Sequence, residues 1–183
     1  MRESFIALAL AFLVALAIIV APVSNNSSSQ QGDAVVHYKG RVCVTKITKD
    51  GEVIDLGCHD NVLTDAGKNL IKNLLGNTGS GGPVQYIALS DNATHVPSAS
   101  DTSLPGEITS GGLERAQGTF VDGGTGTWNI THTFTATTSF TGVRLAGLFN
   151  QSSGGTMLAE NNFTAVNLES GDQLTITWQI TVS

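Results

Sequence analysis

The sequence predicts a mostly β protein: an antiparallel β-sandwich or jelly-roll-like domain with one short amphipathic helix, preceded by an N-terminal hydrophobic helix. Two stretches, TWNITHTFTATT (residues 127–138) and QLTITWQITVS (residues 173–183), alternate apolar side chains with hydroxyl or amide side chains. This alternation is typical of a strand with one buried face and one solvent face. The 21 glycines, and the lack of helix-forming runs after residue 76, favour short strands joined by tight turns.

Strand signals begin at residue 34 and continue to the C-terminus. We expect a hairpin over residues 41–58 and further strands at residues 84–90, 113–121, 128–137, 140–149, 156–160, 163–168 and 174–182. Between the strands expected at 84–90 and 113–121 lies a long loop, residues 93–112. Its Pro97 and Pro105 exclude it from a sheet interior. Eight or nine short strands with turns between them predict two packed sheets.

One helix is predicted, over residues 65–75. Thr64 is its expected N-cap, and Gly76 follows its last residue. The apolar side chains of this segment share one side and should therefore cover a sheet. They are Ala66, Leu70, Ile71, Leu74 and Leu75.

The only two cysteines flank a hairpin signal, the Asp50-Gly51 turn. A four-residue loop at 49–52 pairs residues whose numbers add to 101, so Cys43 faces Cys58. In an exported chain these thiols should form a disulfide worth roughly 3 kcal/mol. The same register places Ile47 opposite Ile54, Thr45 opposite Leu56 and Lys46 opposite Asp55. A metal site is the alternative, but Cys43, Cys58 and His59 supply too few ligands.

The N-terminal segment indicates export. Residues 1–23 form a signal peptide or membrane anchor, because residues 5–21 are an unbroken apolar run preceded by Arg2. Residues 24–33, polar and without periodicity, are expected to be a flexible tether, and residues 34–183 form the β-sandwich domain. The chain therefore contacts a membrane through residues 5–23 at least transiently, and its expected location is extracellular or at the cell surface.

Six Asn-x-Ser/Thr patterns fit an exported glycoprotein, although a chain this rich in Ser and Thr produces some of them by composition alone. They begin at Asn25, Asn26, Asn92, Asn129, Asn150 and Asn162.

Charge and motif content argue against several function classes. Nine basic residues against fifteen acidic ones provide no phosphate-neutralising surface, so nucleic acid is not an expected partner. No nucleophile elbow, zinc-protease, P-loop or CxxC motif occurs, and we predict neither enzymatic activity nor a cofactor. We also predict no metal site, since the four histidines, His37, His59, His95 and His132, are far apart in sequence. The loop acids Asp91, Asp101, Asp122 and Asp172 are possible calcium ligands, but they lack EF-hand spacing.

Three segments carry a family resemblance: NVLTDAGKNLIKNLLG, YIALSDN and LAGLFNQSSGGTMLAENNFTAVNLESGDQLTITW. Together, from about residue 61 to the C-terminus, they resemble small β-domains in structural proteins of tailed bacteriophages, of the tail-fibre and baseplate type. The tether, the Asn-x-Ser/Thr patterns and the threonine-rich faces instead resemble pilin-like and thread-like subunits of microbial, particularly archaeal, surface filaments. In some of those filaments a domain accepts an N-terminal strand from its neighbour. Residues 33–40 are either such a donated strand or the first strand of their own domain.

These features predict a non-catalytic, exported structural subunit of a surface appendage or coat that associates with copies of itself. The alternative is a virus-derived fibre or adhesin module that binds surface glycans through Trp128 or loop residues. A secreted glycan hydrolase would need distant acids, such as Glu107 and Asp122, to come together.

Overall fold

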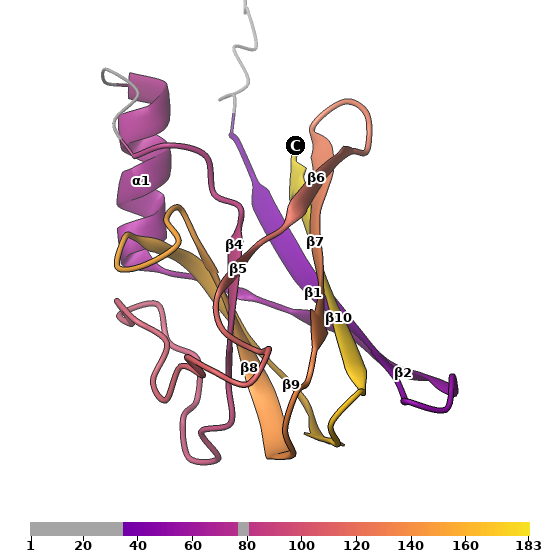
Figure 1. Cartoon of the computed structure of the whole chain (residues 1–183). Helices are drawn as coiled ribbons and strands as arrows, with labels where there is room; N and C mark the ends of the chain where they lie inside the picture. Colours follow the sequence, from indigo (N-terminus) through magenta and orange to yellow (C-terminus); the bar gives the residue numbers. More distant parts are fainter. Residues whose placement is uncertain (1–34, 77–80) are drawn as a thin grey trace, which may run out of the picture. The chain divides into compact units, whose positions relative to one another are not determined.

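The computed structural model describes residues 35–76 and 81–183, and the predicted N-terminal hydrophobic helix, anchor and tether lie outside these residues. The described chain forms two five-stranded antiparallel sheets and one helix, which confirms the predicted fold class (Figure 1). Sheet A has the order β2-β1-β10-β7-β6, and sheet B has the order β3-β9-β8-β4-β5. The elements are β1 (Tyr38–Ile47), β2 (Val53–Asp60), β3 (Val62–Leu63), α1 (Asp65–Gly76), β4 (Tyr86–Ser90), β5 (Ala116–Gln117), β6 (Thr119–Asp122), β7 (Thr127–Thr135), β8 (Phe140–Phe149), β9 (Met157–Leu168) and β10 (Gln173–Val182).

Sheet A is organised around β10, which pairs with β1 on one side and β7 on the other. The predicted alternation holds along it: its inner side chains are at most 2% exposed, while the threonines between them are half-buried. These inner residues are Leu174, Ile176, Trp178 and Ile180. Beyond β10, the backbones of His37 and Ser183 exchange two hydrogen bonds of 2.7 and 3.1 Å, so the two ends of the described chain lie side by side.

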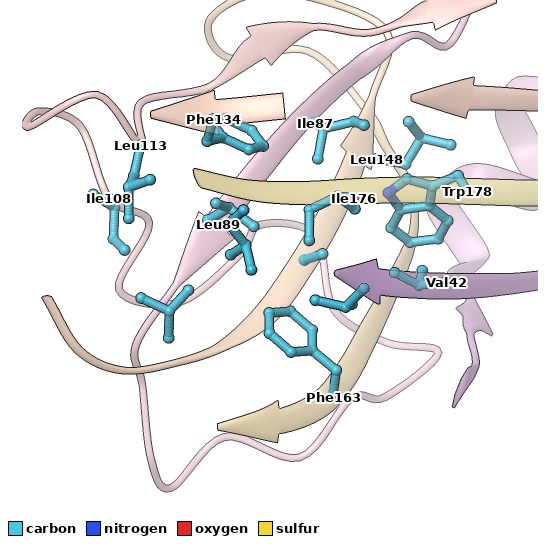
Figure 2. Packing of buried hydrophobic residues seen from close by; sticks show 14 of the residues in the cluster. Val42, Ile87, Leu89, Ile108, Leu113, Phe134, Leu148, Phe163, Ile176 and Trp178 are labelled. Atoms are coloured by element: carbon cyan, nitrogen blue, oxygen red, sulfur yellow. The ribbon is translucent and has the colours of Figure 1, made fainter. Parts of the chain in front are cut away.

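The main core lies between the sheets. Trp178 and Val42 of sheet A face Ile87 and Leu148 of sheet B, and all four side chains are inaccessible to solvent (Figure 2). Sheet B is buried on its outer face as well, where Leu104 of the long loop joins a second cluster. That cluster also contains Ala88, Leu145, Phe149 and Met157. Burial of both faces explains why β8 ends in a continuous apolar run instead of an alternating one.

The hairpin of β1 and β2 keeps the predicted cysteine pair but not the predicted loop. Cys43 faces Cys58, whereas Lys46 faces Ile54 and Ile47 faces Val53, one residue away from the predicted register. The expected pairs of Ile47 with Ile54, Thr45 with Leu56 and Lys46 with Asp55 are therefore wrong. Thr48 and Glu52 close a three-residue loop with Gly51 at a φ of 89°, and a bulge at Gly57, with a φ of 82°, restores the register before the cysteines.

The helix begins as predicted. Thr64 Oγ1 accepts a hydrogen bond of 2.8 Å from Gly67 N, and the same hydroxyl donates to Met157 O at 2.6 Å, which ties the N-cap to β9. Leu70 is buried, but Leu75 is 83% exposed, so the predicted apolar stripe is only partly covered by the sheet.

The predicted strand at residues 113–121 is in fact two strands in different sheets. β5 pairs with β4 in sheet B, and β6 pairs with β7 in sheet A. Between them Gly118 N donates to Gln85 O at 2.7 Å, and the chain crosses from one sheet to the other at this residue. The predicted strands at 156–160 and 163–168, in contrast, are one strand, β9.

Candidate functional site

The solvent face of sheet A carries rows of hydroxyl groups, which we call the threonine face (Thr131, Thr133, Thr175 and Thr177). Across β7 and β10, Thr131 Oγ1 donates to Thr177 Oγ1 at 3.1 Å, and the hydroxyls of Thr133 and Thr175 are 2.9 Å apart. The four hydroxyl groups thus form hydrogen bonds with one another across the two strands. The face is therefore a hydrogen-bonded surface, and no ionisable side chain is among these four residues.

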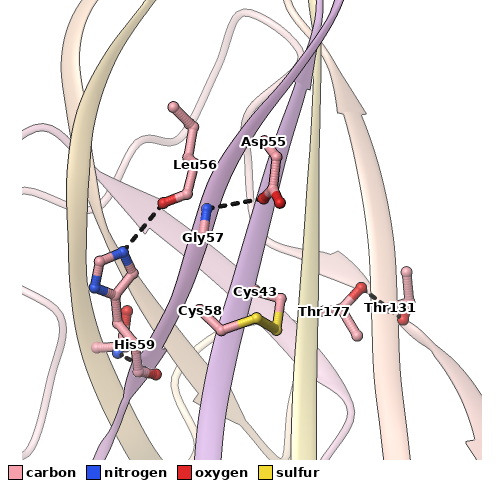
Figure 3. Close-up of a disulfide and its surroundings, with 9 residues drawn as sticks. Cys43, Asp55, Leu56, Gly57, Cys58, His59, Thr131 and Thr177 are labelled. Atoms are coloured by element: carbon pink, nitrogen blue, oxygen red, sulfur yellow. Dashed lines mark hydrogen bonds between the residues drawn. A yellow bond between two sulfur atoms is a disulfide. The ribbon is translucent and has the colours of Figure 1, made fainter.

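The predicted disulfide joins Cys43 to Cys58 and lies on this same face, beside Thr177 (Figure 3). The two Cα atoms are 4.0 Å apart, and the two cysteines face each other directly across β1 and β2. Cys58 lies on the edge strand β2 and is exposed, while Cys43 is half-buried. An exposed disulfide can be reached by cytosolic reductants, so its presence fits an oxidising environment.

The candidate glycan acceptors differ in accessibility. Asn129 lies on the solvent face of β7 and Asn162 is exposed on β9, whereas Asn150 is only 8% exposed. The Asn150 amide nitrogen donates to Gly81 O, and its oxygen accepts from Thr156 N at 2.7 Å, so its side chain holds a turn in place. The Asn92 oxygen caps the backbone of the long loop. Asn25 and Asn26 lie outside the described residues.

An apolar groove opens at the end of the sandwich where the described chain begins. It has a volume of about 380 Å³. It is bounded by α1, the start of β1, β6, the first residues of β7 and the last residues of β10. None of its lining residues is charged. Those used below are Val36, Tyr38, Leu75, Phe120, Trp128 and Val182.

Several groove residues are exposed to an unusual degree for their type. Leu75 is 83%, Val36 72% and Phe120 58% exposed, and they come from three separate segments that meet only in the fold. Below them Tyr38 is largely buried, and this burial raises the pKa of its hydroxyl although Asn61 hydrogen-bonds to it. Trp128, the glycan contact in the alternative adhesin prediction, lines this groove and not the threonine face. Exposed apolar side chains gathered in one groove are a common feature of interaction sites.

A second candidate site, which we call the His95 cluster, joins the long loop to β9. His95 Nε2 lies 3.0 Å from Glu160 Oε2 and 3.3 Å from Asp101 Oδ2. Glu160 is inaccessible to solvent, whereas the side chains of His95 and Asp101 are 13% and 23% exposed. Ser98 N donates to Asp101 Oδ2 at 2.8 Å and to Glu160 Oε1 at 2.9 Å, which draws the two carboxyl groups together.

The two carboxyl groups of the cluster have opposite pKa shifts. Burial, reinforced by the neighbouring Asp101, raises the pKa of Glu160 to about 6. The hydrogen bond with Glu160, together with the Ser98 backbone and His95, lowers the pKa of Asp101. Two adjacent carboxyl groups behave in this way because both cannot readily carry charge at once.

The other shielded acids in the described chain have basic partners. Asp172, which is 3% exposed, lies 2.8 Å from Lys46 Nζ. Glu107 receives two hydrogen bonds, of 2.6 and 2.8 Å, from the Arg115 guanidinium, which also stacks over Phe149. Glu107 is thus engaged beside sheet B, while Asp122, at the end of β6 in sheet A, caps its own turn. The structure does not pair these two acids as a hydrolase would require.

Sequence reasoning named His95 and Asp101 only separately and did not single out Glu160. The available signal was a lone acid within the apolar run MLAENNF, since a charged residue inside a buried strand needs a partner. The apolar groove had no comparable signal, because its residues come from many segments spread along the domain. His132 packs beside Phe134, with ring centroids 4.6 Å apart.

Fold and sites together define a class of protein: a disulfide-bonded antiparallel β-sandwich with an open apolar groove at one end. No model of a known protein family matches the chain, and no curated protein sequence matches it significantly. Within residues 35–76 and 81–183, no helix has the length and apolar character needed to cross a bilayer.

Proposed function

We propose that the chain is a non-catalytic, exported structural subunit that assembles with copies of itself into a cell-surface filament or coat. The observation that carries the proposal is the apolar groove, an uncharged surface rimmed by exposed Val36, Leu75 and Phe120. Apolar area left in water is unfavourable, and burying it against a partner stabilises an assembly. In this proposal, the occupant of the groove is part of the apolar run at residues 5–21 of a second copy.

The composition of the run supports this choice of occupant. Thirty-four residues precede Val35, and they contain the longest uninterrupted apolar run of the chain, residues 5–21. The run has no charged residue, and neither has the wall of the groove. A charged or strongly polar occupant would lose its hydration in such a groove without gaining hydrogen bonds in return.

Val36 itself lines the groove, so the groove lies beside the position where residues 1–34 join the domain. Occupation of the groove by the apolar run of a second copy would link each subunit to the next, as a filament or coat requires.

The pairing of β1 limits which residues are exchanged. Tyr38, Lys39 and Gly40 pair with Val182, Thr181 and Ile180 of β10 in the same domain. The part of residues 33–40 that the structure places in a strand is therefore the first strand of its own domain. The proposed contact between copies consequently lies before Val35.

Two further features support an extracellular setting. The exposed Cys43–Cys58 disulfide is the kind of bond that persists in oxidising compartments. Asn129 and Asn162, both within Asn-x-Thr patterns, lie on solvent-facing strand positions where a glycan would not disturb the core.

The test is assembly of the full chain, exported and purified under oxidising conditions, with Leu75→Asp and Phe120→Asp as groove variants. Burying an unpaired carboxylate costs more than about 1.4 kcal/mol, so each variant should reduce the assembled fraction at least about tenfold. Sedimentation and electron microscopy measure that fraction. Both positions are exposed, so the variants should retain the thermal stability of the domain.

The matched control is Val53→Asp, another exposed apolar position, which lies on β2 and does not line the groove. It should assemble like the unmodified chain. A photo-crosslinker at Trp128, in a mixture of isotopically light and heavy copies, should capture residues 5–21 of the other copy. Normal assembly of both groove variants, or crosslinks confined to single copies, would contradict the proposal.

A further inference from the structure

We propose that His95, Asp101 and Glu160 form a binding site for a divalent transition-metal ion of the zinc type, which holds the long loop against β9. The three residues do not line the groove, and the proposal does not depend on how copies assemble.

The spacing of the three side chains fits such an ion. The imidazole nitrogen lies 3.0 Å from one carboxylate oxygen and 3.3 Å from the other, and the three ligand atoms lie within 4.8 Å of one another. In a tetrahedral zinc site, ligands about 2.0–2.1 Å from the metal are about 3.3 Å from one another. An ion bound by all three atoms would therefore require only small adjustments of the two carboxyl groups.

The types of donor atom also select this class of metal. One imidazole nitrogen and two carboxylate oxygens form a mixed set that suits zinc and its neighbours in the first transition row, whereas calcium prefers six or more oxygen ligands. Glu160 closes the inner side of the site, and the partial exposure of His95 and Asp101 leaves an outer side where water can complete the coordination.

The charge balance of the cluster is the independent reason to expect a cation. Asp172 has Lys46 and Glu107 has Arg115, but in the described part of the chain neither Asp101 nor Glu160 forms a salt bridge with a lysine or arginine. Two carboxyl groups, one of them fully buried, thus have a single imidazole as their only basic side-chain partner among the described residues. A bound divalent ion would supply the missing positive charge.

The ligands are held in place by the surrounding backbone. Ser98 N donates to both carboxyl groups, and the Asn92 side-chain oxygen accepts from His95 N at 3.1 Å. Glu160 is fixed within β9, where it pairs with Gly147 of β8 and Val62 of β3. Such second-layer contacts set ligand orientation and commonly change metal affinity by about 10–100-fold when removed.

The experiment uses the full chain, stripped with a chelator and titrated with Zn²⁺ near neutral pH. Calorimetry should show one tight equivalent per chain, and the melting temperature should rise by a few degrees. Co²⁺, as a spectroscopic substitute, should give visible absorption bands of a low-coordinate nitrogen and oxygen site. Glu160→Gln and Asp101→Asn should each weaken binding at least about tenfold.

Two controls keep the result interpretable. His37→Ala removes an exposed histidine outside the cluster and should leave binding unchanged. Asp101→Asn changes a partly exposed loop residue, so it should remain folded by circular dichroism even where Glu160→Gln does not. Failure of the unmodified chain to bind Zn²⁺, or equal binding by folded Asp101→Asn and His95→Ala variants, would show a purely hydrogen-bonded clamp and overturn the proposal. Neither result would bear on assembly through the groove.

Discussion

At the scale of single residues, Asp172 shows how one buried carboxylate ties distant segments together. Its side chain accepts hydrogen bonds from Lys49 N at 2.8 Å and Glu169 N at 3.0 Å, and it lies 2.8 Å from Lys46 Nζ. It thereby links the β1–β2 hairpin to the turn that precedes β10. The Glu169 amide first, and then Lys46, lower its pKa from the usual 3.8 to about 2.

This shift predicts a specific acid sensitivity. Because the folded-state pKa lies below that of the unfolded chain, the stabilisation from Asp172 is complete above about pH 4 and is lost as the pH falls toward 2. Asp172→Asn should lower the free energy of unfolding by roughly 2 kcal/mol at pH 7, the value of a charged hydrogen bond. The difference from the unmodified chain should shrink across that acidic window in urea titrations.

Asp50→Asn, an exposed change in the neighbouring hairpin loop, is the matched control and should have little effect at either pH. An undiminished effect of Asp172→Asn at pH 2 would mean that its charge contributes nothing to stability.

Single-residue roles were predictable where they depend on near neighbours in the sequence. The Thr64 cap follows from the three-residue spacing to Gly67, and the cysteine pair follows from the turn between the two thiols. Asp172 and Glu160 act instead through partners that are distant in sequence, such as Lys46 and His95. Only the strand order brings those partners together, and no local pattern encodes it.

At the scale of elements, the disulfide is expected to matter more for stability than for shape. Cys58 lies on the edge strand β2, outside the core between the sheets, so the double substitution of Cys43 and Cys58 by Ser should leave a folded domain. The two cysteines are 15 residues apart, and removing such a crosslink should cost about 3 kcal/mol in the chain-entropy treatment. Guanidinium denaturation, with and without a thiol reductant, measures this difference. Reductant should destabilise the unmodified chain and leave the serine variant unchanged. Equal stability of the two proteins without reductant would contradict the expectation.

The contact between α1 and β9 gives a second element-scale prediction. A Cβ atom at Gly67 would lie only 2.8 Å from the carbonyl carbon of Leu158. The helix can therefore pack this close to the strand only because residue 67 has no side chain. Gly67→Ala should therefore lower the free energy of unfolding by about 1–3 kcal/mol, although alanine favours helices.

Gly76→Ala, at the last residue of the same helix, is the matched control. A Cβ there meets nothing within 4 Å, and thermal melts should show a neutral or slightly stabilising effect. A stabilising effect of Gly67→Ala would mean that helix and strand separate easily.

Element types were largely predictable from sequence, because alternation and helical periodicity are local properties. The failures have physical causes of their own. The hairpin loop is a residue shorter than predicted because the Gly57 bulge absorbs the extra residue on β2. The strand predicted at 113–121 divides because the chain changes sheets at Gly118.

At the scale of the whole molecule, composition and turn spacing predicted two antiparallel sheets, and this is confirmed. Neither candidate site was predictable in the same way. The groove needs the start of β1, the end of α1 and the edge strand β6 at one end of the sandwich, and the His95 cluster needs the long loop folded onto sheet B. Both sites are formed by segments that are distant in sequence, and local sequence patterns do not show which distant segments meet.

The hydrogen bonds between His37 and Ser183 have a practical consequence for handling this protein. Because the C-terminal residue lies next to Val36 and Val182 at the groove, an affinity tag or fluorescent fusion appended after Ser183 would stand at the very surface through which neighbouring copies are proposed to join. The exposed turn around Ser152 and Ser153, between β8 and β9 and outside the groove, is the safer position for a label.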